Sequence, residues 1–336
     1  MSKSAVSNYS GSKVLVLLVG LLLLTAGISL LVGRYPSVKI LSPAEIAGDE
    51  LAYRLVMNLR LPRILTAILL GMSLSAAGLV FQMIFGNPLV EPGFLGVSQG
   101  ASFGAAFAII FLSNKTVTIQ ASATLFAIAG LGFSYILAHR LRYGGWVLRL
   151  VLAGIAVSAL FSSGVGLLKY MADPLSQLPE ITFWLLGGLS SLTWGQFLSI
   201  FPVVSLSLIV LLLLRWRLNL LSLSDAAAYS MGISPKLERG ILLGAGVLAT
   251  AAVISVSGMV GWVGLIVPHL ARRIFGADAR MTLPASLLIG GIFTLLCDDM
   301  ARILLPGEIP LGVVTSLLGA VSFIILLSLP NFRIQR

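Results

Sequence analysis

RWRLNLLSLSDAAAYSMGISPKLER, from Arg215 to Arg239, is the longest break in apolar sequence in the second half of the chain. Runs long enough to cross a bilayer lie on both sides of it. Asp225 stands where an N-cap would precede three helix-favouring alanines, and Gly232 follows at the spacing of a C-cap. Pro235 prevents the helix from continuing. The stretch therefore predicts a short solvent-exposed helix between two membrane spans.

Two interpretations of this segment stay open from its residues alone. It is either a solvated loop that joins two helices or a docking element for a soluble partner. Its ends are basic, with Arg215 and Arg217 on one side and Lys236 and Arg239 on the other. Positive charge of this kind collects on the cytoplasmic side of membrane proteins.

Composition assigns the whole chain to the membrane. The 336 residues are 58% hydrophobic and only 10% charged, whereas soluble domains carry about 25% charged residues. Their mean hydropathy is +1.04. The 35 glycines suit helices that pack closely in lipid. We expect an all-α polytopic membrane protein that forms a single transmembrane domain over residues 1–336.

Apolar runs of about 20 residues predict roughly ten transmembrane helices. The net charge of +10 then reflects basic cytoplasmic loops and does not indicate a nucleic-acid partner. Most Lys and Arg residues fall on the side that places both termini in the cytoplasm. The expected spans cover residues 14–32, 60–85, 94–112, 119–138, 146–170, 196–214, 283–304 and 311–329, with two more inside 240–275, where Pro268 should break the second helix. Gly33 to Leu59 is expected to be an outer loop.

Several kinds of chemistry are disfavoured by what the sequence lacks. No GxxxxGK[ST] pattern occurs, so ATP would have to bind to another polypeptide. The single cysteine, Cys297, excludes an internal disulfide, and two histidines exclude a His-rich metal site. The chain is expected to bind no cofactor or metal and to have no catalytic residues of its own.

A turn with a glycine stripe follows the second span, in QMIFGNPLVEPGFLGVSQGA (Gln82–Ala101). Asn87 and Pro88 favour a tight turn. Glycines then recur every three or four residues on one helix face, at Gly93, Gly96, Gly100 and Gly104. Such a face permits very close helix packing, and it could alternatively line a transport pathway.

Three charged residues lie near the end of the expected span 283–304, namely Asp298, Asp299 and Arg302. Arg302 lies four residues after Asp298 and three after Asp299, so either carboxylate can pair with it on one helix face. Structural pairing, a role at the outer mouth and proton coupling are the three interpretations. His269, which follows Pro268 close to Gly264, is interpreted as a structural hydrogen-bonding group or a pathway residue.

Six motifs occur together and in a fixed order over residues 60–329. This set resembles the permease family of type II ABC importers for iron–siderophore complexes, haem and vitamin B12. The motifs are RLPR, GNPLVEPGFLGVSQGA, FWLLGGL, LNLLSLSDAAAYSMGIS, GWVGLIVPHLARRIFGADAR and DDMARILLPGEIPLGVVTSLLGAVSFIILL.

The resemblance implies a homodimer in the prokaryotic cytoplasmic (inner) membrane. Two cytoplasmic ATPase subunits, which carry the ATP, would bind below it, and an extracytoplasmic substrate-binding protein would dock above it. Residues 215–239 would form the cytoplasmic coupling loop. The matching coupling positions are Leu218, Asn219, Leu223, Ala226, Ala227, Ala228 and Gly232. Asp225, although it differs from the family's commoner residue, is assigned to the same coupling site. Ser224, Asp225, Met259 and Trp262 depart from the family's commoner residues, which leaves the cargo open.

Basic residues at the outer side need compensation, because they oppose the positive-inside bias. Arg302 has Asp298 and Asp299 nearby, but Arg60 and Arg63 have no acid within four residues. Membrane lipid phosphate is one candidate partner. Carboxylates of the docking protein are the other, because a guanidinium holds a carboxylate through two hydrogen bonds.

The sequence thus predicts the membrane subunit of an ATP-driven importer for a bulky metal chelate. The alternative is a secondary transporter driven by ions. The docking-type central segment and the lack of an isolated acid near a bilayer midplane favour the importer.

Overall fold

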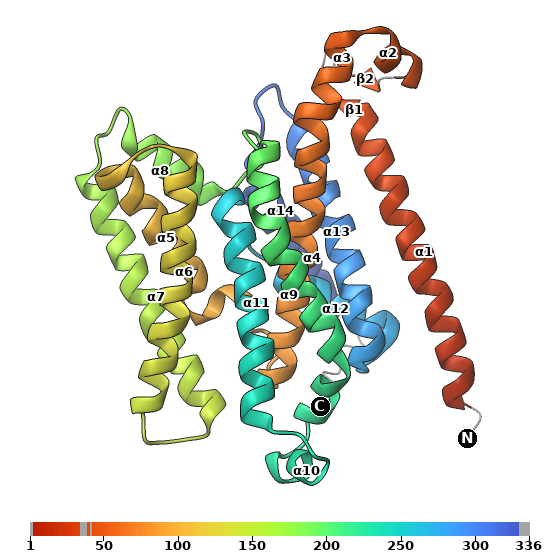
Figure 1. The fold of residues 1–336 in the computed structure, drawn as a ribbon, viewed down its shortest axis with the longest axis vertical. Helices are drawn as coiled ribbons and strands as arrows, with labels where there is room; N and C mark the ends of the chain where they lie inside the picture. The colour runs from red at the N-terminus through yellow and green to blue at the C-terminus, as the bar shows by residue number, and fades with distance from the viewer. Residues whose placement is uncertain (1–2, 34–38, 41, 329–336) are drawn as a thin grey trace.

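Helices dominate the computed structural model, which describes residues 3–33, 39–40 and 42–328 (Figure 1). Within these residues, seven helices are long and apolar enough to cross a bilayer. They are α1 (Lys3–Leu31), α4 (Leu61–Phe85), α6 (Thr116–Arg140), α7 (Trp146–Met171), α9 (Trp194–Leu221), α11 (Pro235–Ser257) and α13 (Ala279–Ile303). The all-α polytopic fold class is therefore confirmed.

Three shorter helical segments occupy the remaining predicted spans. They are α5 (Val97–Phe107) with the π-helical turn η3 (Ala108–Leu112), α12 (Val263–Phe275) and α14 (Leu311–Ser328). The other elements are β1 (Val32–Gly33), β2 (Lys39–Ile40), α2 (Pro43–Gly48), α3 (Glu50–Leu55), the π-helical turn η1 (Val56–Arg60), the 3₁₀ turn η2 (Pro92–Leu95), α8 (Gln177–Leu186) and α10 (Asp225–Ser230). β1 and β2 form a small antiparallel pair.

Two boundaries differ from the sequence prediction. The expected outer loop 33–59 contains the short helix α2, and from Glu50 the chain is continuously helical to Phe85. α9 runs on to Leu221, so Arg215 and Arg217 belong to its last turns. Residues 329–336, with the basic C-terminal end predicted to be cytoplasmic, lie outside the described residues.

The second of the two spans expected inside residues 240–275 is a short helix. α12 has 13 residues and is therefore about 20 Å long, well short of a hydrocarbon core of about 30 Å. Pro268 lies inside α12 and does not break it, contrary to the prediction. A proline leaves the carbonyl four residues earlier without its helical donor. The amide Nε2 of Gln82 donates to that carbonyl, Gly264 O, at 3.2 Å, so α12 continues.

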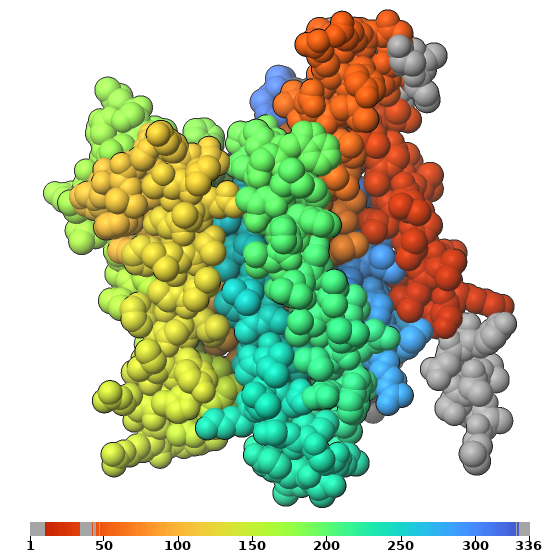
Figure 2. Space-filling view, in the orientation of Figure 1, coloured from red at the N-terminus to blue at the C-terminus, as the bar shows by residue number. Residues whose placement is uncertain are grey.

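α4 is the central helix and packs against α9, α11, α12 and α13. Its glycines allow direct backbone contact with two neighbours. A Cβ added at Gly71 would collide with the carbonyl of Gly290 in α13, and one at Gly78 would collide with the carbonyl of Gly264 in α12. These contacts fix the middle of the bundle, whereas α1 stands at its edge (Figure 2).

The two ends of the bundle carry different elements. α10 projects from one end, and the N-terminal half of α1 lies toward that end (Figure 1). α2, α3 and α8 lie at the opposite end. The predicted interfacial element FWLLGGL (Phe183–Leu189) begins inside α8, which ends before Gly187 with its φ of +70°.

Candidate functional site

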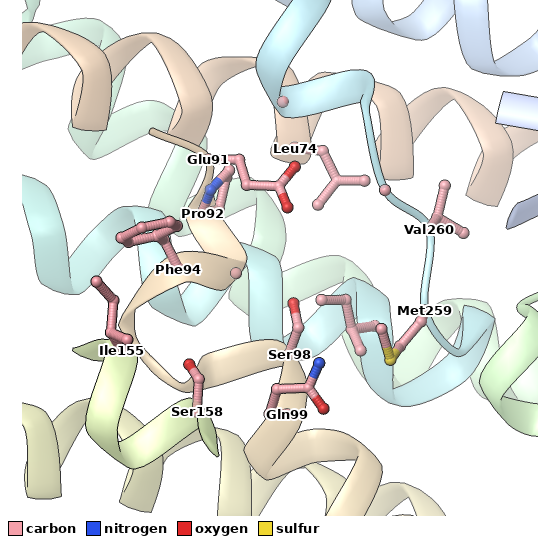
Figure 3. A pocket seen from close by; sticks show the side chains of 14 residues that line it. Leu74, Glu91, Pro92, Phe94, Ser98, Gln99, Ile155, Ser158, Met259 and Val260 are labelled. Atoms are coloured by element: carbon pink, nitrogen blue, oxygen red, sulfur yellow. The ribbon is translucent and has the colours of Figure 1, made fainter. Parts of the chain in front are cut away.

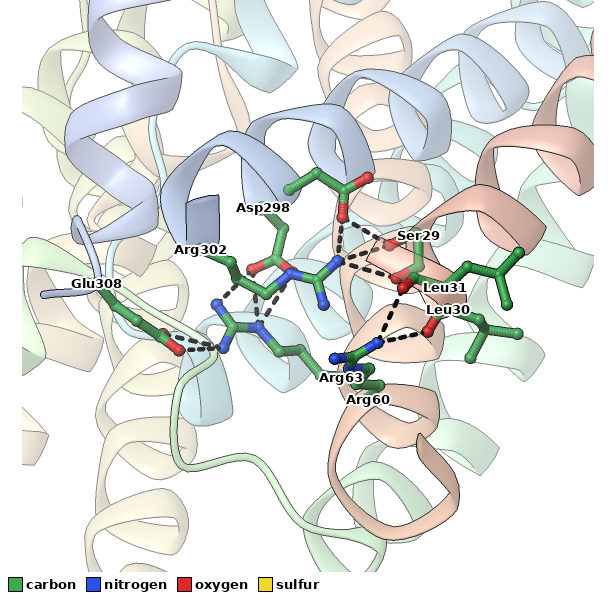
Figure 4. Close-up of polar contacts among 9 residues, drawn as sticks. Ser29, Leu30, Leu31, Arg60, Arg63, Asp298, Arg302 and Glu308 are labelled. Atoms are coloured by element: carbon green, nitrogen blue, oxygen red, sulfur yellow. Dashed lines mark hydrogen bonds and ion pairs between the residues drawn. The ribbon is translucent and has the colours of Figure 1, made fainter. Parts of the chain in front are cut away.

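A buried cluster of charged side chains joins α4, α13 and the loop that follows α13 (Figure 4). Arg63 lies at its centre. Its Nε donates to both carboxylate oxygens of Asp298 at 3.0 Å, and its Nη2 donates to Oδ1 at 2.9 Å. Its Nη1 donates to both oxygens of Glu308 at 2.9 Å. One guanidinium therefore binds a carboxylate on each of two edges.

A second arginine extends the cluster to α1. Arg302 lies 3.5 Å from Oδ2 of Asp298 and forms an ion pair with Asp299. Its Nη2 also donates to Ser29 Oγ at 2.8 Å, and that hydroxyl donates to Asp299 at 2.6 Å. The side-chain pairing predicted within residues 298–302 is thus present, and Ser29 attaches α1 to it.

Arg60 plays a different part in the same region. Its Nη1 donates to the carbonyl oxygens of Leu30 at 2.8 Å and Leu31 at 3.3 Å. These carbonyls belong to the last turn of α1, where helical acceptors lack partners and a positive charge is favourable. Arg60 therefore stabilises the C-terminal end of α1.

The three arginines that the sequence suggested for docking are buried in the structure. Arg60, Arg63 and Arg302 are 5%, 7% and 8% exposed. The acids that compensate Arg63 were invisible to a search of nearby sequence, because Asp298 and Glu308 lie 235 and 245 positions away. A direct role of these three residues in docking remains a prediction.

The central segment forms a compact turn at the opposite end of the bundle. Ser224 is the N-cap of α10, and its hydroxyl accepts from the amide of Ala227. Asp225 is the first helical residue instead of the cap, and its carboxylate accepts from Arg239 at 2.8 Å. Gly232 has a φ of +79°, as expected of a glycine that terminates a helix.

Of the other predicted coupling residues, some hold the turn against the bundle and others are exposed on its surface. Asn219 bridges to the start of α13: its Nδ2 donates to Asp278 at 2.6 Å, and its Oδ1 accepts from the amide of Ala279 at 2.9 Å. Leu218 is buried at 1% exposure. Large apolar side chains nevertheless remain exposed around α10, namely Leu223, Tyr229 and Met231. We call these three residues the inner apolar patch.

A cavity of about 290 Å³, open on one side, lies where η2 and α5 meet α7 and the segment between α11 and α12 (Figure 3). Polar atoms from Glu91, Ser98, Gln99 and Ser158 line it together with apolar side chains. The carboxylate of Glu91 accepts a hydrogen bond from the backbone amide of Trp262. The site can therefore hold a small group that needs both polar and apolar contacts.

Trp262 has the one positive φ of a residue other than glycine in the described part of the chain, at +72°. Such a conformation costs about 1–3 kcal/mol and persists only where neighbours enforce it. The bond to Glu91 and the contact of its ring with Phe323 of α14 hold it in place. The start of α12 is thus tied to both the cavity and α14.

The turn after α4 is attached to α12 from the other side. Asn87 Oδ1 accepts from the amide of Leu89 at 2.9 Å and stabilises the turn locally. His269 Nε2 lies 2.9 Å from the carbonyl oxygen of Pro88. His269 therefore has the structural hydrogen-bonding role that was one of its two interpretations.

The glycine stripe serves mainly for packing. A Cβ at Gly100 or Gly104 would collide with backbone oxygens of α6, and Gly96 has a φ of +83° between η2 and α5. Gly93 and Gly264 line the cavity instead. The pathway interpretation of the stripe remains a prediction.

Four candidate residues had little or no local sequence signal. Glu91, Trp262 and Glu308 lie in turns, and their partners are distant in sequence. Gly71 is one of many glycines in apolar runs. An acid inside the glycine-rich turn was the single clue that could have identified Glu91.

The profile of the FecCD transport family matches residues 18–328. The chain belongs to this family. The recognition of an ABC-importer permease from the motifs is therefore confirmed, and the match extends from the middle of α1 to the end of α14.

Relatives with different named cargoes are similar over most of the chain. A probable iron chelatin transport system permease protein of Helicobacter pylori is 44% identical over 81% of this chain and 82% of its own length. The molybdate import system permease protein MolB of Haemophilus influenzae is 37% identical over 93% and 94%. The vitamin B12 import system permease protein of Vibrio cholerae is 37% identical over 92% and 91%.

One solved structure has the same fold. It is described as an inward-facing conformation of a metal-chelate type ABC transporter, with a TM-score of 0.86 and 38% identity. The alignment covers 94% of this chain and 99% of that one. This FecCD family member therefore has the architecture of a transport permease.

Proposed function

We propose that this FecCD family member is the membrane subunit of an ATP-driven importer that moves a metal chelate into the cytoplasm. The proposal rests on the inner apolar patch, which lies on a turn that side-chain bonds hold in place. Asp225, Arg239 and Asn219 fix the turn by side-chain bonds, yet Tyr229 and Met231 are 58% and 59% exposed. A rigid turn with exposed apolar side chains suits docking of another protein.

The proposal assigns this docking to two ATPase subunits, which would carry the ATP. A short helix that is fixed at both ends moves as a rigid unit. The ion pair of Asp225 with Arg239 fixes its first residue, and the left-handed backbone of Gly232 fixes the turn after its last one. α10 lies on the side of the bundle that we assign to the cytoplasm, together with the N-terminal half of α1. The protein itself would then be a multi-pass subunit of the prokaryotic inner membrane without catalytic residues.

A second copy of the chain is also part of the proposal. α7 exposes Ile155, Leu160 and Leu167, and α14 exposes Leu317 and Val321. In a homodimer these faces would flank one shared pathway, next to the cavity that Ser158 and Glu91 line.

The cargo is the least constrained part of the proposal. Relatives named for iron chelatin and vitamin B12 favour a bulky chelate, including haem and iron–siderophore complexes. Molybdate is the second candidate, because the relative named for it is similar over 93% of the chain.

Transport by reconstituted complexes tests this function. The chain, its ATPase and its extracytoplasmic binding protein are placed in proteoliposomes with a labelled ferric siderophore, haem, cobalamin or molybdate. We expect ATP-dependent uptake of one chelate that survives ionophores. Uptake that requires an ion gradient and does not depend on ATP would instead identify the protein as a secondary transporter.

A further inference from the structure

The turn between α4 and α5 returns from the end of the bundle to its middle. A Cβ added at Gly264 would lie 2.7 Å from Pro92 and 2.9 Å from the carbonyl oxygen of Leu74, so these three residues meet. Leu74 is eleven residues before Phe85, the last residue of α4, which corresponds to about 16 Å along a helix. The chain therefore covers this distance back into the bundle in the seven residues from Phe85 to Pro92.

Glu91 directly precedes Pro92 and therefore lies at a similar depth, near the middle of the membrane. Ser158, which lines the same cavity, is the thirteenth of the 26 residues of α7. The sequence predicts no isolated acid at this depth, because it places the turn after α4 at the membrane surface. The return of the turn into the bundle brings Glu91 there instead.

The carboxylate of Glu91 has no basic partner among the residues that the structure describes. It accepts from the backbone amide of Trp262, which is neutral. Figure 3 shows the carboxylate directed from the turn toward Leu74 and the segment that carries Val260. An acid within the membrane is costly unless an opposite charge compensates it, and such acids usually belong to substrate or ion pathways. A positively charged ligand would supply the compensation that the described side chains do not.

The size and the lining of the cavity indicate which kind of cation it suits. Its volume of about 290 Å³ is many times the space of one water molecule, about 30 Å³. No group of three acids, histidines or cysteines that could hold a metal ion occurs in the described part of the chain. Phe94, Ile155 and Met259 add apolar surface, and an aromatic ring also attracts organic cations. These features favour an alkylammonium group over an inorganic ion.

We infer that this cavity binds a protonated amine of the cargo and that Glu91 compensates its charge. The inference rests on the proposed importer function, because the amine would be a side group of the transported chelate. Ser98, Gln99 and Ser158 can accept further hydrogen bonds from the ammonium group. A cavity of this size is at the lower limit of pockets that hold a drug-sized ligand. It therefore takes a side group, and the metal centre stays outside.

Selection by charge is the functional consequence. A carboxylate near the middle of the membrane repels an anion such as molybdate and attracts a chelate that carries a basic side group. The permease would then contribute its own selectivity to transport. Of the two kinds of cargo considered above, the cavity favours the chelate over the oxyanion.

Two chelates that differ in one terminal group test the inference. Ferrioxamine B carries a protonated primary amine on an alkyl chain, whereas its N-acetyl derivative carries a neutral amide there. Binding of each radiolabelled chelate is measured to the complex of this chain with its ATPase in nanodiscs, without the binding protein. We expect the wild type to bind ferrioxamine B about tenfold more tightly, because its amine forms a charge-assisted hydrogen bond with Glu91.

Glu91→Gln removes the charge but keeps an oxygen that can accept from the amide of Trp262. This variant should bind the two chelates equally, to within about twofold, because the charge-assisted bond is lost. Glu180→Gln is the matched control. Glu180 in α8 is also partly buried, and it accepts from the neutral Asn114 at 2.7 Å. This control should keep the preference of the wild type, and gel filtration shows which variants are folded.

A second variant tests the location without a change of charge. Ser158→Leu fills the cavity from α7 and leaves the bond between Glu91 and Trp262 in place. It should abolish the preference for ferrioxamine B. This variant decides the question if Glu91→Gln does not fold, and a preference that persists in it would refute the assigned cavity.

The remaining outcomes separate the inference from the proposed function. Equal binding of the two chelates by the wild type would overturn the inference, and so would a preference that persists in Glu91→Gln. Loss of the preference in Glu180→Gln as well would reduce it to an effect of net charge and also overturn it. Complexes that import a chelate with ATP but show no preference for the amine refute only the inference. Complexes that show the preference without ATP-driven uptake refute only the proposed function.

Discussion

Asp298 is a fully buried acid whose charge two arginines compensate. Arg63 binds it through Nε and Nη2, and Arg302 approaches its second oxygen. A buried ion is costly unless its partners are well placed, and loss of one partner leaves the full desolvation penalty of the other. Removal of Asp298 is therefore costly, because it would leave the buried charges of Arg63 and Arg302 without this carboxylate.

The first prediction is that Asp298→Asn destabilises the protein by about 3–5 kcal/mol, the range for breaking a buried ion pair. Arg63 would keep Glu308 but lose its inner carboxylate. Thermal unfolding in detergent measures the effect. Arg54→Gln, which breaks an exposed pair with Glu50, should cost less than about 1 kcal/mol. Equal shifts in the two variants would contradict a structural role for the cluster.

At the scale of elements, contact between helices depends on glycines that face each other. Gly71 of α4 and Gly290 of α13 each lack room for a Cβ, because the carbonyl of the other occupies that space. Close backbone approach of this kind is how helices gain packing energy in lipid. The effect of a methyl group should therefore depend entirely on its position.

The second prediction contrasts two substitutions by alanine. Gly71→Ala should separate α4 from α13 and reduce the yield of folded protein several-fold. Gly244→Ala adds the same methyl group to α11 where no heavy atom lies within 4 Å, and it should leave the yield unchanged. Fluorescence-detected gel filtration of both variants provides the comparison. A normal elution profile for Gly71→Ala would refute the tight contact.

The third prediction concerns the end of α10. Gly232 has open space around its Cα but a left-handed backbone. Gly232→Val should therefore act through strain alone, at about 1–2 kcal/mol, and impair both transport and assembly with the ATPase. Gly232→Asn should retain both activities, because asparagine tolerates this conformation. Equal behaviour of the valine and asparagine variants would exclude backbone strain as the cause.

Local patterns were sufficient to predict α10 and the pairing of Arg302. Both depend on residues within a few positions of each other: the alanine run before Gly232, and acids three and four residues before Arg302. Partners from distant segments could not be found in this way. Arg63 meets Asp298 from 235 positions away, and the cavity is assembled from turns and helices whose relative placement exists only in the folded chain.

The length of α12 could not be predicted for a similar reason. Its run of apolar residues continues the pattern of the preceding span, and Pro268 suggests a break. The helix instead begins at the strained backbone of Trp262 and passes through Pro268 with help from Gln82. Both causes are tertiary contacts.

At the scale of the whole molecule, the two ends of the bundle should face opposite compartments. α10 occupies one end of the bundle, and β1, which follows α1, lies at the other (Figure 1). The charge cluster belongs to that second end, because Arg60 and Arg302 bond to the last turn of α1. The distribution of basic residues predicts that α10 faces the cytoplasm.

The fourth prediction tests this orientation with a membrane-impermeant maleimide on cells whose outer membrane is permeabilised. Gly307→Cys should be labelled while the inner membrane is intact, and Ser230→Cys only after that membrane is opened. The native Cys297 is buried, so its background should be low, and Cys297→Ser supplies the control. The reverse pattern of labelling would invert the assigned topology.

The attachment of α1 also sets an order of events during synthesis. Ser29 contacts Asp299, which is added 270 residues later. At about 5–20 residues per second, the ribosome needs roughly 15–55 seconds to supply it. Until then α1 is held by its own hydropathy and by the bonds from Arg60, and Arg63 lacks its buried acid. A helix made near the end of synthesis, α13, thus completes the attachment of the first one.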